Sequence, residues 1–420
     1  MQINGVRFEQ LNFIQKRILY EMDKRDRLAV IGGPGTGKTF IAVFAILKAL
    51  QENKDSFFLV YNKNLNLYIK KLIGKESFPE YLAKTYHSWL PSYLSQVLDN
   101  YPISRIRDEL MIRGESFDYR WAEITKLLQN VHPNKKRKYD FLFVDEAQDM
   151  PLPLIDILKD ASKKLMVTFD DSQKIGTDYF KAQKDQQFDR TEILTRLDLA
   201  DSFFDLTQNY RNTQPVERVA KLFGQYFKPN AFTLRQETSP LKGPLPYLIK
   251  TKDALQRASL IVNMFIQQQN LQIGILFANT RQKEDTEKII QFKTYLLHAL
   301  GALSPFLFYK LENETMIQSF DAPGIYLMSM NSSKGLEFDH VFIIETEWLK
   351  LENDHQANLV YVACTRSRSG LTFLYENHAA GCLALAFENP LLFNTLDASI
   401  NETQEEDLTI LSVMRELEHE

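Results

Sequence analysis

The stretch Gly32-Gly33-Pro34-Gly35-Thr36-Gly37-Lys38-Thr39 has the spacing G-x-x-x-x-G-K-T of a loop that binds phosphate. Its glycines let backbone N–H groups curl around phosphate oxygens without a clash from Cβ atoms. Lys38 supplies positive charge to the β- and γ-phosphates, and the Thr39 hydroxyl is a ligand for Mg²⁺. An apolar run at 28–31 and a helical pattern at 40–51 provide the strand–loop–helix context of the motif. The sequence therefore predicts a nucleoside triphosphate site at 32–39.

A second motif follows the apolar run 139–144, where the chain continues as Asp145-Glu146-Ala147-Gln148-Asp149. An aspartate at the tip of a buried strand beside a phosphate loop can hold Mg²⁺. A neighbouring glutamate can orient and deprotonate an attacking water molecule. An acidic turn after a core strand is the structural alternative, and the phosphate loop makes us favour the functional one. We therefore expect Thr39 and Asp145 to bind the metal and Glu146 to act as a general base.

Short apolar, β-branched or aromatic runs alternate with amphipathic stretches along the whole chain. Helical periodicity appears at 40–51, 252–269 and 282–300. Buried strands that alternate with helices indicate an α/β fold whose parallel sheets are covered on both faces. The expected strands are 28–31, 56–61, 141–144, 165–169, 203–206, 273–278, 325–330, 341–345 and 371–375.

The length of 420 residues allows two or three domains. A break near 198–201 divides the pattern, so we expect one core at 1–200 and a second at 201–400. Residues 88–138 look helical and are expected to form a small insertion in the first core. The strongly acidic stretch 401–420 is expected to be a solvated tail. Residues of the insertion that are available for packing are Trp89, Tyr93, Leu94, Leu98, Trp121, Ile124 and Leu128.

Composition restricts the class of protein. The chain is 44% hydrophobic and 25% charged, as in ordinary soluble globular proteins. It has no run of about 18 uncharged apolar residues, and residues 1–10 lack the apolar region of a secretory signal. Cys364 and Cys382 lie in apolar surroundings, so we expect neither a disulfide framework nor a metal site, and a reducing cytoplasm fits. The net charge of −4 argues against a passive basic binder of nucleic acid, but leaves room for a local binding groove.

The phosphate loop followed by Asp-Glu-Ala-Gln-Asp resembles the UvrD/Rep-like superfamily 1 helicases, and further motifs appear in family order between Leu11 and Tyr375. The resemblance implies two RecA-like P-loop NTPase cores, ATP and Mg²⁺ as ligands, and 3′ to 5′ movement along single-stranded DNA. Leu11-Asn12-Phe13-Ile14-Gln15 implies that Gln15 contacts the adenine. Phe169-Asp170-Asp171-Ser172-Gln173 implies that Gln173 senses the γ-phosphate.

Three stretches resemble motifs of the family's second core. Gln208-Asn209-Tyr210-Arg211 implies that Tyr210 stacks on the adenine and that Arg211 reaches the γ-phosphate. Ser332-Ser333-Lys334-Gly335-Leu336-Glu337-Phe338 implies Glu337 near the ribose, and Tyr361-Val362-Ala363-Cys364-Thr365-Arg366 implies Arg366 as an arginine finger. An arginine added to a transferring phosphoryl group is worth roughly 10³–10⁵ in rate. If both arginines serve one γ-phosphate, the two cores must close on ATP and part after hydrolysis.

Contacts to nucleic acid are inferred from shorter patterns. Val60-Tyr61-Asn62-Lys63 and Thr85-Tyr86-His87-Ser88 resemble the strand-contacting motifs of the first core. Directly before the motif at 332–338, Asn331 stands in place of a histidine that is frequent in the family. We interpret the basic run Lys135-Lys136-Arg137-Lys138 as a solvated loop. RNA stays open as an alternative track. The candidate contacts are Asn62, Lys63, Thr85, His87, Asn331 and Ser332.

Two departures from the family pattern suggest an alternative function. Only a short piece at 303–319 remains where longer members carry a large insertion, so we expect the second accessory domain to be absent or vestigial. The stacking aromatic that often follows the motif at 169–173 in the family is missing, and Tyr179 or Phe180 either replaces it or packs in the core. The alternative is a nucleotide-gated regulatory ATPase that controls a partner protein, such as a nuclease in a defence or repair complex, and unwinds little.

Overall fold

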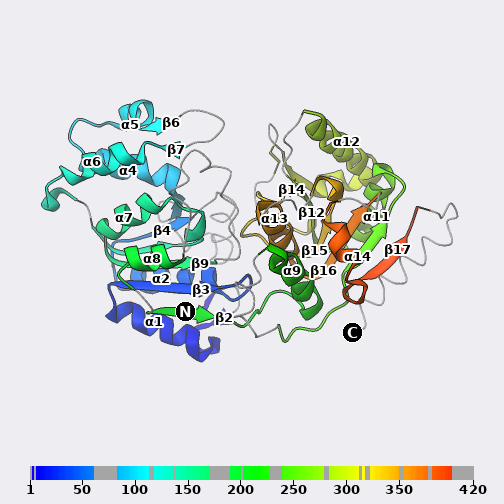
Figure 1. Cartoon of the computed structure of the whole chain (residues 1–420), viewed down its shortest axis with the longest axis horizontal. Coiled ribbons are helices and arrows are strands. Elements are labelled where there is room, and N and C mark those ends of the chain that lie inside the picture. Colours follow the sequence, from blue (N-terminus) through cyan, green and yellow to red (C-terminus); the bar gives the residue numbers. More distant parts are fainter. Residues whose placement is uncertain are drawn as a thin grey trace. The chain divides into compact units, whose positions relative to one another are not determined.

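The computed structural model describes residues 2–3, 6–60, 83–112, 118–136, 138–170, 190–199, 202–227, 239–278, 283–311, 315–316, 322–349, 354–376 and 381–399. The chain divides into two compact units, Met1–Thr207 and Gln208–Glu420. Each unit is built on one large sheet with helices packed against it (Figure 1). The described strands of both large sheets pair in parallel, which confirms the expected α/β class.

The sheet of the first unit has the strand order β10-β3-β9-β8-β4-β5. Side chains alternate between its two faces, as the pleat of a strand requires. One face packs on α1 (Phe13–Lys24) and α2 (Lys38–Gln51), and the other on α7 (Leu152–Asp160) and α8 (Arg190–Arg196). Burial on both faces explains why the central strands are continuously apolar. The strands are β3 Arg27–Gly32, β4 Ser56–Val60, β5 Ala83–Thr85, β8 Tyr139–Val144, β9 Ser162–Phe169 and β10 Phe203–Leu206.

The stretch expected to be a helical insertion contains α4 (Tyr86–Val97), α5 (Ile103–Glu109) and α6 (Trp121–Gln129). It also contains an antiparallel pair of short strands, β6 (Met111–Ile112) and β7 (Asp118–Tyr119), which the periodicity does not reveal. The seven residues expected to be available for packing are all buried, and they extend the core of the sheet face that carries α7. The insertion is therefore packed onto the sheet domain through one continuous apolar core.

The sheet of the second unit has the strand order β13-β14-β12-β15-β16-β11-β17. Helices α11 (Ala254–Gln267) and α12 (Lys283–Leu300) cover one face. On the other face α9 (Gln214–Phe227) packs its Phe223 ring 5.7 Å from that of Phe373, and α13 (Asp354–Cys364) lies beside α9. The strands are β11 Tyr247–Lys250, β12 Gln272–Phe277, β13 Leu307–Lys310, β14 Gly324–Ser329, β15 Phe338–Ile343, β16 Ser367–Tyr375 and β17 Asn394–Asp397.

Two expected boundaries differ from the structure. The break expected near 198–201 precedes β10, yet β10 pairs with β3 in the first sheet, so the first unit extends to Thr207. The piece 303–319 was expected to be the remnant of an insertion. It starts instead within a 3₁₀ helix (Gly301–Phe306). The next element is β13, which pairs with β14 and forms an edge of the second sheet. Within the described part of the chain, no helix is both long and apolar enough to cross a bilayer.

Candidate functional site

The phosphate loop connects the end of β3 to the start of α2. Gly35 (φ 71°) and Gly37 (φ 89°) adopt left-handed backbone conformations that a glycine reaches without strain. Gly32 is needed for a different reason, since a Cβ atom there would lie 2.5 Å from Thr36 Oγ1 and 3.0 Å from Leu206 Cβ. The first residue of α2 is Lys38, so the positive end of the helix dipole faces the loop.

The Lys38 side chain is buried inside the curl of this loop. Its Nζ atom donates to the carbonyl oxygen of Gly32 at 2.8 Å and to that of Gly33 at 3.0 Å. Thr36 Oγ1 donates to the same Gly33 carbonyl at 2.8 Å, which braces the turn. An ammonium group has three N–H donors, so two of them fix the side chain and, within the described part of the chain, the third is left for a phosphate oxygen.

Gln15 lies beside the loop from a neighbouring helix. It forms a capping box with Asn12 at the start of α1, in which Gln15 N donates to Asn12 Oδ1 at 2.8 Å and Asn12 N donates to Gln15 Oε1 at 3.1 Å. Its Nε2 group lies 3.0 Å from where a Cβ of Gly37 would be. The capping box therefore holds the Gln15 amide against the phosphate loop, with its Nε2 group directed at Gly37.

The acidic motif follows β8, which pairs with β9 and β4 in the middle of the first sheet. Asp145 is fully buried, and Thr39 Oγ1 donates to its Oδ2 atom at 2.6 Å. Thr168, at the end of β9, donates to the other carboxylate oxygen. The two expected metal ligands thus lie in direct contact.

Both expected metal ligands present oxygen atoms, which is the donor type that Mg²⁺ prefers. Burial, and next the charge of Glu146, raise the pKa of Asp145, while hydrogen bonds from Thr168 and Thr39 and the charge of Lys38 oppose that rise. A divalent cation would stabilise the charged form of the carboxyl group, which burial disfavours. The site therefore fits Mg²⁺, with remaining ligands supplied by phosphate oxygens and water.

Glu146 occupies a left-handed backbone conformation (φ 56°, ψ 45°) that is uncommon for a residue with a side chain. Gln148 Nε2 donates to Glu146 Oε2, and Gln148 Oε1 accepts from the backbone N–H of Asp170 at 3.1 Å. Gln148 therefore connects the carboxylate of Glu146 to the end of β9. This positions a carboxylate one residue beyond the expected metal ligand, as a general base requires.

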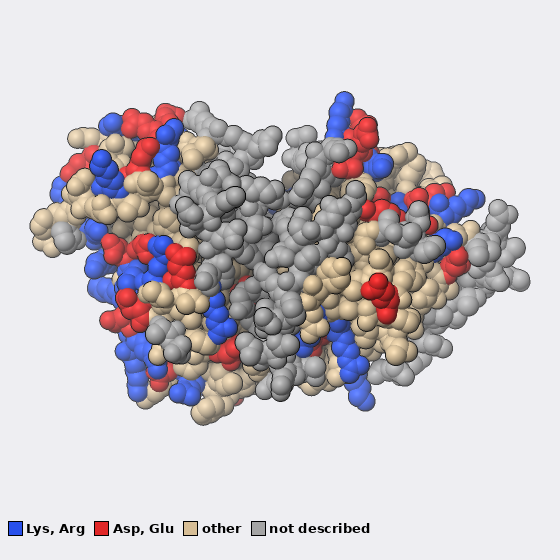
Figure 2. Space-filling model, viewed as in Figure 1, with Lys and Arg blue, Asp and Glu red and all other residues tan. Residues whose placement is uncertain are grey.

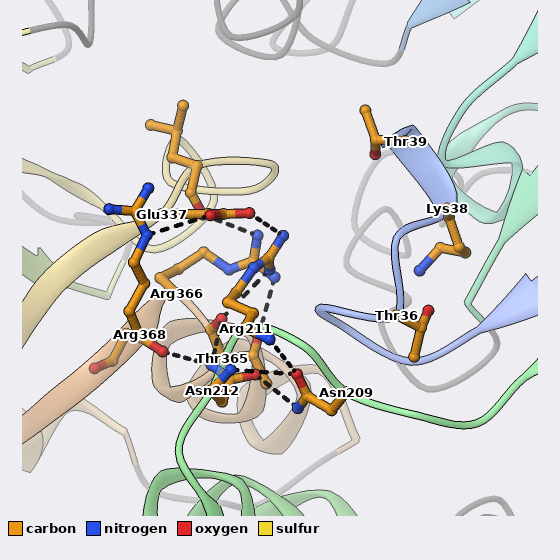
Figure 3. Close-up of polar contacts among 12 residues, drawn as sticks. Thr36, Lys38, Thr39, Asn209, Arg211, Asn212, Glu337, Thr365, Arg366 and Arg368 are labelled. Carbon is orange, nitrogen blue, oxygen red and sulfur yellow. Dashed lines mark hydrogen bonds and ion pairs between the residues drawn. The ribbon is translucent and has the colours of Figure 1, made fainter. Parts of the chain in front are cut away.

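In the second unit, the two arginines expected at the γ-phosphate gather with Glu337 (Figure 3). Arg211 Nη2 forms an ion pair with Glu337 Oε1 at 2.6 Å, and both side chains are largely buried. Arg368 also contacts Glu337, at 3.4 Å, and Asp339 at 3.0 Å. The Glu337 carboxylate, expected near a ribose, therefore contacts the guanidinium groups of Arg211 and Arg368.

Arg366 is buried, with 2% of its surface exposed. Its guanidinium donates to the carbonyl of Val362 at 3.0 Å, the carbonyl of Leu336 at 3.3 Å and the hydroxyl of Thr365 at 3.0 Å. Service as an arginine finger would require Arg366 to exchange some of these bonds for phosphate oxygens. The Tyr210 ring, expected against adenine, is 44% exposed and donates its hydroxyl to Gln208 Oε1 at 2.8 Å.

Two of the nucleic-acid candidates lie where β5 runs into α4. Thr85 precedes α4 and makes no capping bond through its side chain. The His87 ring lies 3.8 Å from that of Tyr86 and is stacked at 6.1 Å on Tyr119 of the insertion. Tyr119 Oη also donates to the His87 carbonyl at 3.1 Å. The insertion thus supports the orientation of His87.

Another pair of candidates follows β14 in the second unit. Ser329 Oγ donates to Ser332 Oγ at 3.1 Å and accepts from Ser332 N at 3.3 Å. Among the described residues, buried Oδ1 of Asn331 has no hydrogen-bond partner. Both residues lie at the carboxyl end of a parallel strand, where ligands of such sheets bind. The remaining candidates Asn62, Lys63 and Gln173, together with Tyr179 and Phe180, lie outside the described residues.

The basic run is balanced by acidic residues. Lys135 pairs with Asp99 at 2.6 Å, and Lys136 pairs with Asp160 at 3.0 Å. On the face shown in Figure 2, the described acidic and basic side chains of the first unit are interspersed, and they do not gather into a basic patch. These pairs agree with the interpretation of the run as a solvated loop.

Several residues of the site escape sequence reasoning. Thr168 carries only a weak signal, as the polar residue within the apolar run of β9. Gln148 belongs to the quoted acidic motif, but its contact with Glu146 depends on the turn. Asn212 and Arg368 lie one and two residues beyond recognised motifs. Their contacts with Thr365 and Glu337 form only when distant segments of the chain fold together.

Comparisons with known proteins match both units. A family model for an AAA domain matches residues 15–177, and a family model for the UvrD-like helicase C-terminal domain matches residues 324–374. No curated protein matches the chain. Among solved structures, the chain is similar to the C-terminal domain of a possible DNA helicase from Lactobacillus plantarum WCFS1. That similarity has 19% identity and a TM-score of 0.32, and covers 44% of this chain and 98% of that one. The two matched models, one in each unit, support a UvrD-like helicase, an ATP-hydrolysing enzyme.

Proposed function

We propose that the protein is a Mg²⁺-dependent translocase that uses ATP hydrolysis to move 3′ to 5′ along single-stranded DNA. The observation that carries the proposal is the contact between Thr39 Oγ1 and Asp145 Oδ2 at 2.6 Å, beside a formed phosphate loop. The neighbouring carboxylate of Glu146 adds the base that hydrolysis needs.

In the first unit, Lys38 binds phosphate oxygens and the Gln15 amide contacts the adenine. Bound by Thr39 and Asp145, Mg²⁺ would neutralise negative charge on the phosphates. Glu146 orients the attacking water and accepts its proton, while Gln148 holds the carboxylate in place. This arrangement positions the reactants and disperses charge, which is what phosphoryl transfer requires.

In the second unit, Arg211 and Arg366 stabilise charge on the γ-phosphate, Tyr210 stacks on the adenine and Glu337 contacts the ribose. The Arg211–Glu337 ion pair is consistent with this assignment, because it keeps the arginine proposed for the γ-phosphate next to the glutamate proposed for the ribose. Gln173 reports the state of the nucleotide. Arg366→Ala should lower kcat by about 10³ or more and spare ATP affinity.

The bound single-stranded DNA runs past the carboxyl ends of the β-strands in both units. Thr85, His87, Asn331 and Ser332 contact it, with Asn62 and Lys63 as further contacts. The support is positional: Thr85 ends β5, and Asn331 and Ser332 follow β14, at the edge of each sheet where ligands bind.

The test is steady-state ATP hydrolysis by the purified protein alone, with single-stranded DNA and with single-stranded RNA. Lys38→Ala should abolish hydrolysis, whereas Lys48→Ala, which removes a partly exposed lysine of the same helix, should not. A large stimulation by DNA that exceeds that by RNA supports the proposal. Equal stimulation by RNA would mean that the protein acts on single-stranded nucleic acid of both kinds, and not on DNA alone.

The alternative function is a regulatory ATPase that controls a partner protein, such as a nuclease, with little unwinding. The short connection between β13 and β14 favours it, because it leaves little room for an accessory domain between these two strands, and the acidic stretch 401–420 offers charge for contact with a partner. Hydrolysis that responds to neither nucleic acid would support this alternative and contradict the translocase.

A further inference from the structure

One buried side-chain amide joins the two arginine-bearing loops of the second unit. Asn212 directly follows Arg211 and is fully buried. Its Nδ2 group donates to the carbonyl of Thr365 at 3.1 Å and also to that of Ser367, and these two residues flank Arg366 (Figure 3). Its Oδ1 atom accepts from Asn209 Nδ2 at 2.9 Å. Both N–H groups and the oxygen of the amide are therefore engaged.

Asn209 extends this network to the backbone that carries Arg211. Asn209 Oδ1 accepts from the backbone N–H of Arg211 at 2.9 Å and from that of Asn212 at 3.2 Å. Such a side-chain turn fixes the local backbone. One residue further on, Thr213 N donates to the Arg368 carbonyl at 2.9 Å. The loop 209–213 is thus held along the chain at 365–368 by side-chain and backbone bonds.

Thr365 is the residue that both arginines share. Its carbonyl oxygen, which accepts from Asn212, also lies 3.5 Å from Arg211 Nη1. Its hydroxyl accepts from Arg366 Nη2 at 3.0 Å. A change in the position of Thr365 relative to Asn212 would therefore alter the placement of both guanidinium groups together.

We propose that Asn212 is a positioning residue that keeps the Arg211 and Arg366 loops in one fixed arrangement, so that the two arginines act as a unit. This inference rests on the proposed roles of both arginines in hydrolysis. Asn212→Asp preserves the shape of the side chain but replaces the NH2 group, which donates to the carbonyls of Thr365 and Ser367, by a carboxylate oxygen that can only accept. The loops would then separate, and a displacement of about 1 Å can cost about 10² in rate.

The experiment measures single-turnover ATP hydrolysis for Asn212→Asp in the wild-type protein and in Arg366→Ala. We expect a loss of about tenfold or more in the wild-type background and less than about twofold in Arg366→Ala, because residues that act as a unit are not additive. ATP affinity should change little in both backgrounds. Asn389→Asp is the matched control: Asn389 Nδ2 donates to the Leu385 carbonyl at 2.9 Å in the same unit, and this variant should hydrolyse ATP at the wild-type rate.

A general loss of structure would reduce hydrolysis by the same factor in both backgrounds, and that result would overturn the inference. An Asn212→Asp rate equal to that of Asn389→Asp would also overturn it. Should Asn212→Asp not fold, Asn212→Ser removes the reach to both carbonyls without adding charge and must show the same dependence on Arg366. If Arg366→Ala alone hydrolyses ATP normally, the proposed role of that arginine fails first, and this inference fails with it.

Discussion

Glu146 and Glu345 occupy matching places in the two sheets but have different surroundings. Each stands two residues beyond an interior strand, after β8 and after β15. Each adopts the same left-handed conformation, with φ 56° and ψ 45° at Glu146 and φ 52° and ψ 44° at Glu345. Each is followed by a short 3₁₀ helix. The backbone of this turn is therefore a feature of both units.

The side chains around the two glutamates differ in charge. Glu146 follows Asp145 and accepts from the neutral amide of Gln148. Glu345 follows the buried apolar Ile344 and pairs with the Arg257 guanidinium at 2.8 Å, with both side chains largely buried. A carboxylate that is neutralised by a buried arginine is poorly suited to accept a proton from water.

The comparison shows that backbone geometry alone does not create the catalytic position. The same strained turn becomes a candidate active site where an acid and a phosphate loop lie beside it, and a structural ion pair where an arginine does. Neighbouring side chains decide between the two outcomes, and substitutions at these neighbours can test the difference.

The largest expected effect follows removal of the base. Glu146→Gln should lower kcat by about 10² to 10⁴, because the amide cannot accept the proton of the attacking water. ATP binding should persist, since Lys38 and the loop remain intact. Rapid-quench hydrolysis and fluorescent nucleotide binding separate the two quantities. Normal turnover in this variant would remove Glu146 from the catalytic role.

The next effect tests the ion pair of the second unit. Arg257→Met should destabilise the protein by about 3 kcal/mol near pH 8, because two carboxylates, Glu345 and Glu376, then lose the guanidinium group that pairs with both of them. Burial raises the pKa of Glu345, and Arg257 opposes that rise, so the variant raises the pKa further. A raised folded pKa means that stability falls as pH rises through it, so the loss should be smaller near pH 5.

Urea denaturation at the two pH values measures this dependence. Arg105→Met serves as the control, because it removes an exposed pair with Glu109 in the first unit and should unfold at the wild-type midpoint. A loss for Arg257→Met that does not change with pH would contradict the assignment of Glu345 as the titrating group.

A smaller effect concerns the groups that orient Asp145. Thr168→Val keeps the shape of the residue and removes its hydrogen bond to the carboxylate. Loss of a partner that orients a metal ligand typically weakens metal affinity by about 10-fold to 100-fold, so more Mg²⁺ should be needed for half-maximal hydrolysis. Thr372→Val is the control, because it removes a buried hydroxyl 2.9 Å from His340 in the second sheet. An unchanged Mg²⁺ requirement in Thr168→Val would argue against this role of the hydroxyl.

Much of the fold could be predicted, because interior strands of parallel sheets are continuously apolar. The runs at 28–31, 141–144 and 273–278 correspond to β3, β8 and β12. The strands of the large sheets that were not predicted are β5, β13 and β17, which are short and lie at sheet edges, and β11, a four-residue strand between β16 and β17. An edge strand pairs on one side only and needs less apolar surface, as β17 illustrates with two exposed and two half-buried residues.

Prediction of the site succeeded where one contiguous stretch carries the chemistry, as in the loop that ends in Lys38 and Thr39. It did not reach contacts that depend on two distant segments. Thr168 approaches Asp145 only because β9 pairs with β8, and Asn212 approaches Thr365 from 153 residues away in the chain. No local pattern encodes such pairings, because they arise when the sheet and its loops assemble.

The smallest expected effect is that of Glu345→Gln. Hydrolysis should stay within about twofold of wild type, since this glutamate has no role in the chemistry. Stability should change by about 1 kcal/mol or less, because the cost of burying the charge offsets much of the attraction to Arg257. The wild-type protein loses stability as pH rises through the raised pKa of Glu345. The variant lacks this titrating group, so its stability should increase relative to that of the wild type towards about pH 8. Urea denaturation and steady-state hydrolysis test both parts. A loss of hydrolysis comparable to that of Glu146→Gln would mean that the shared turn makes both glutamates functional, and the contrast between the two units would fail.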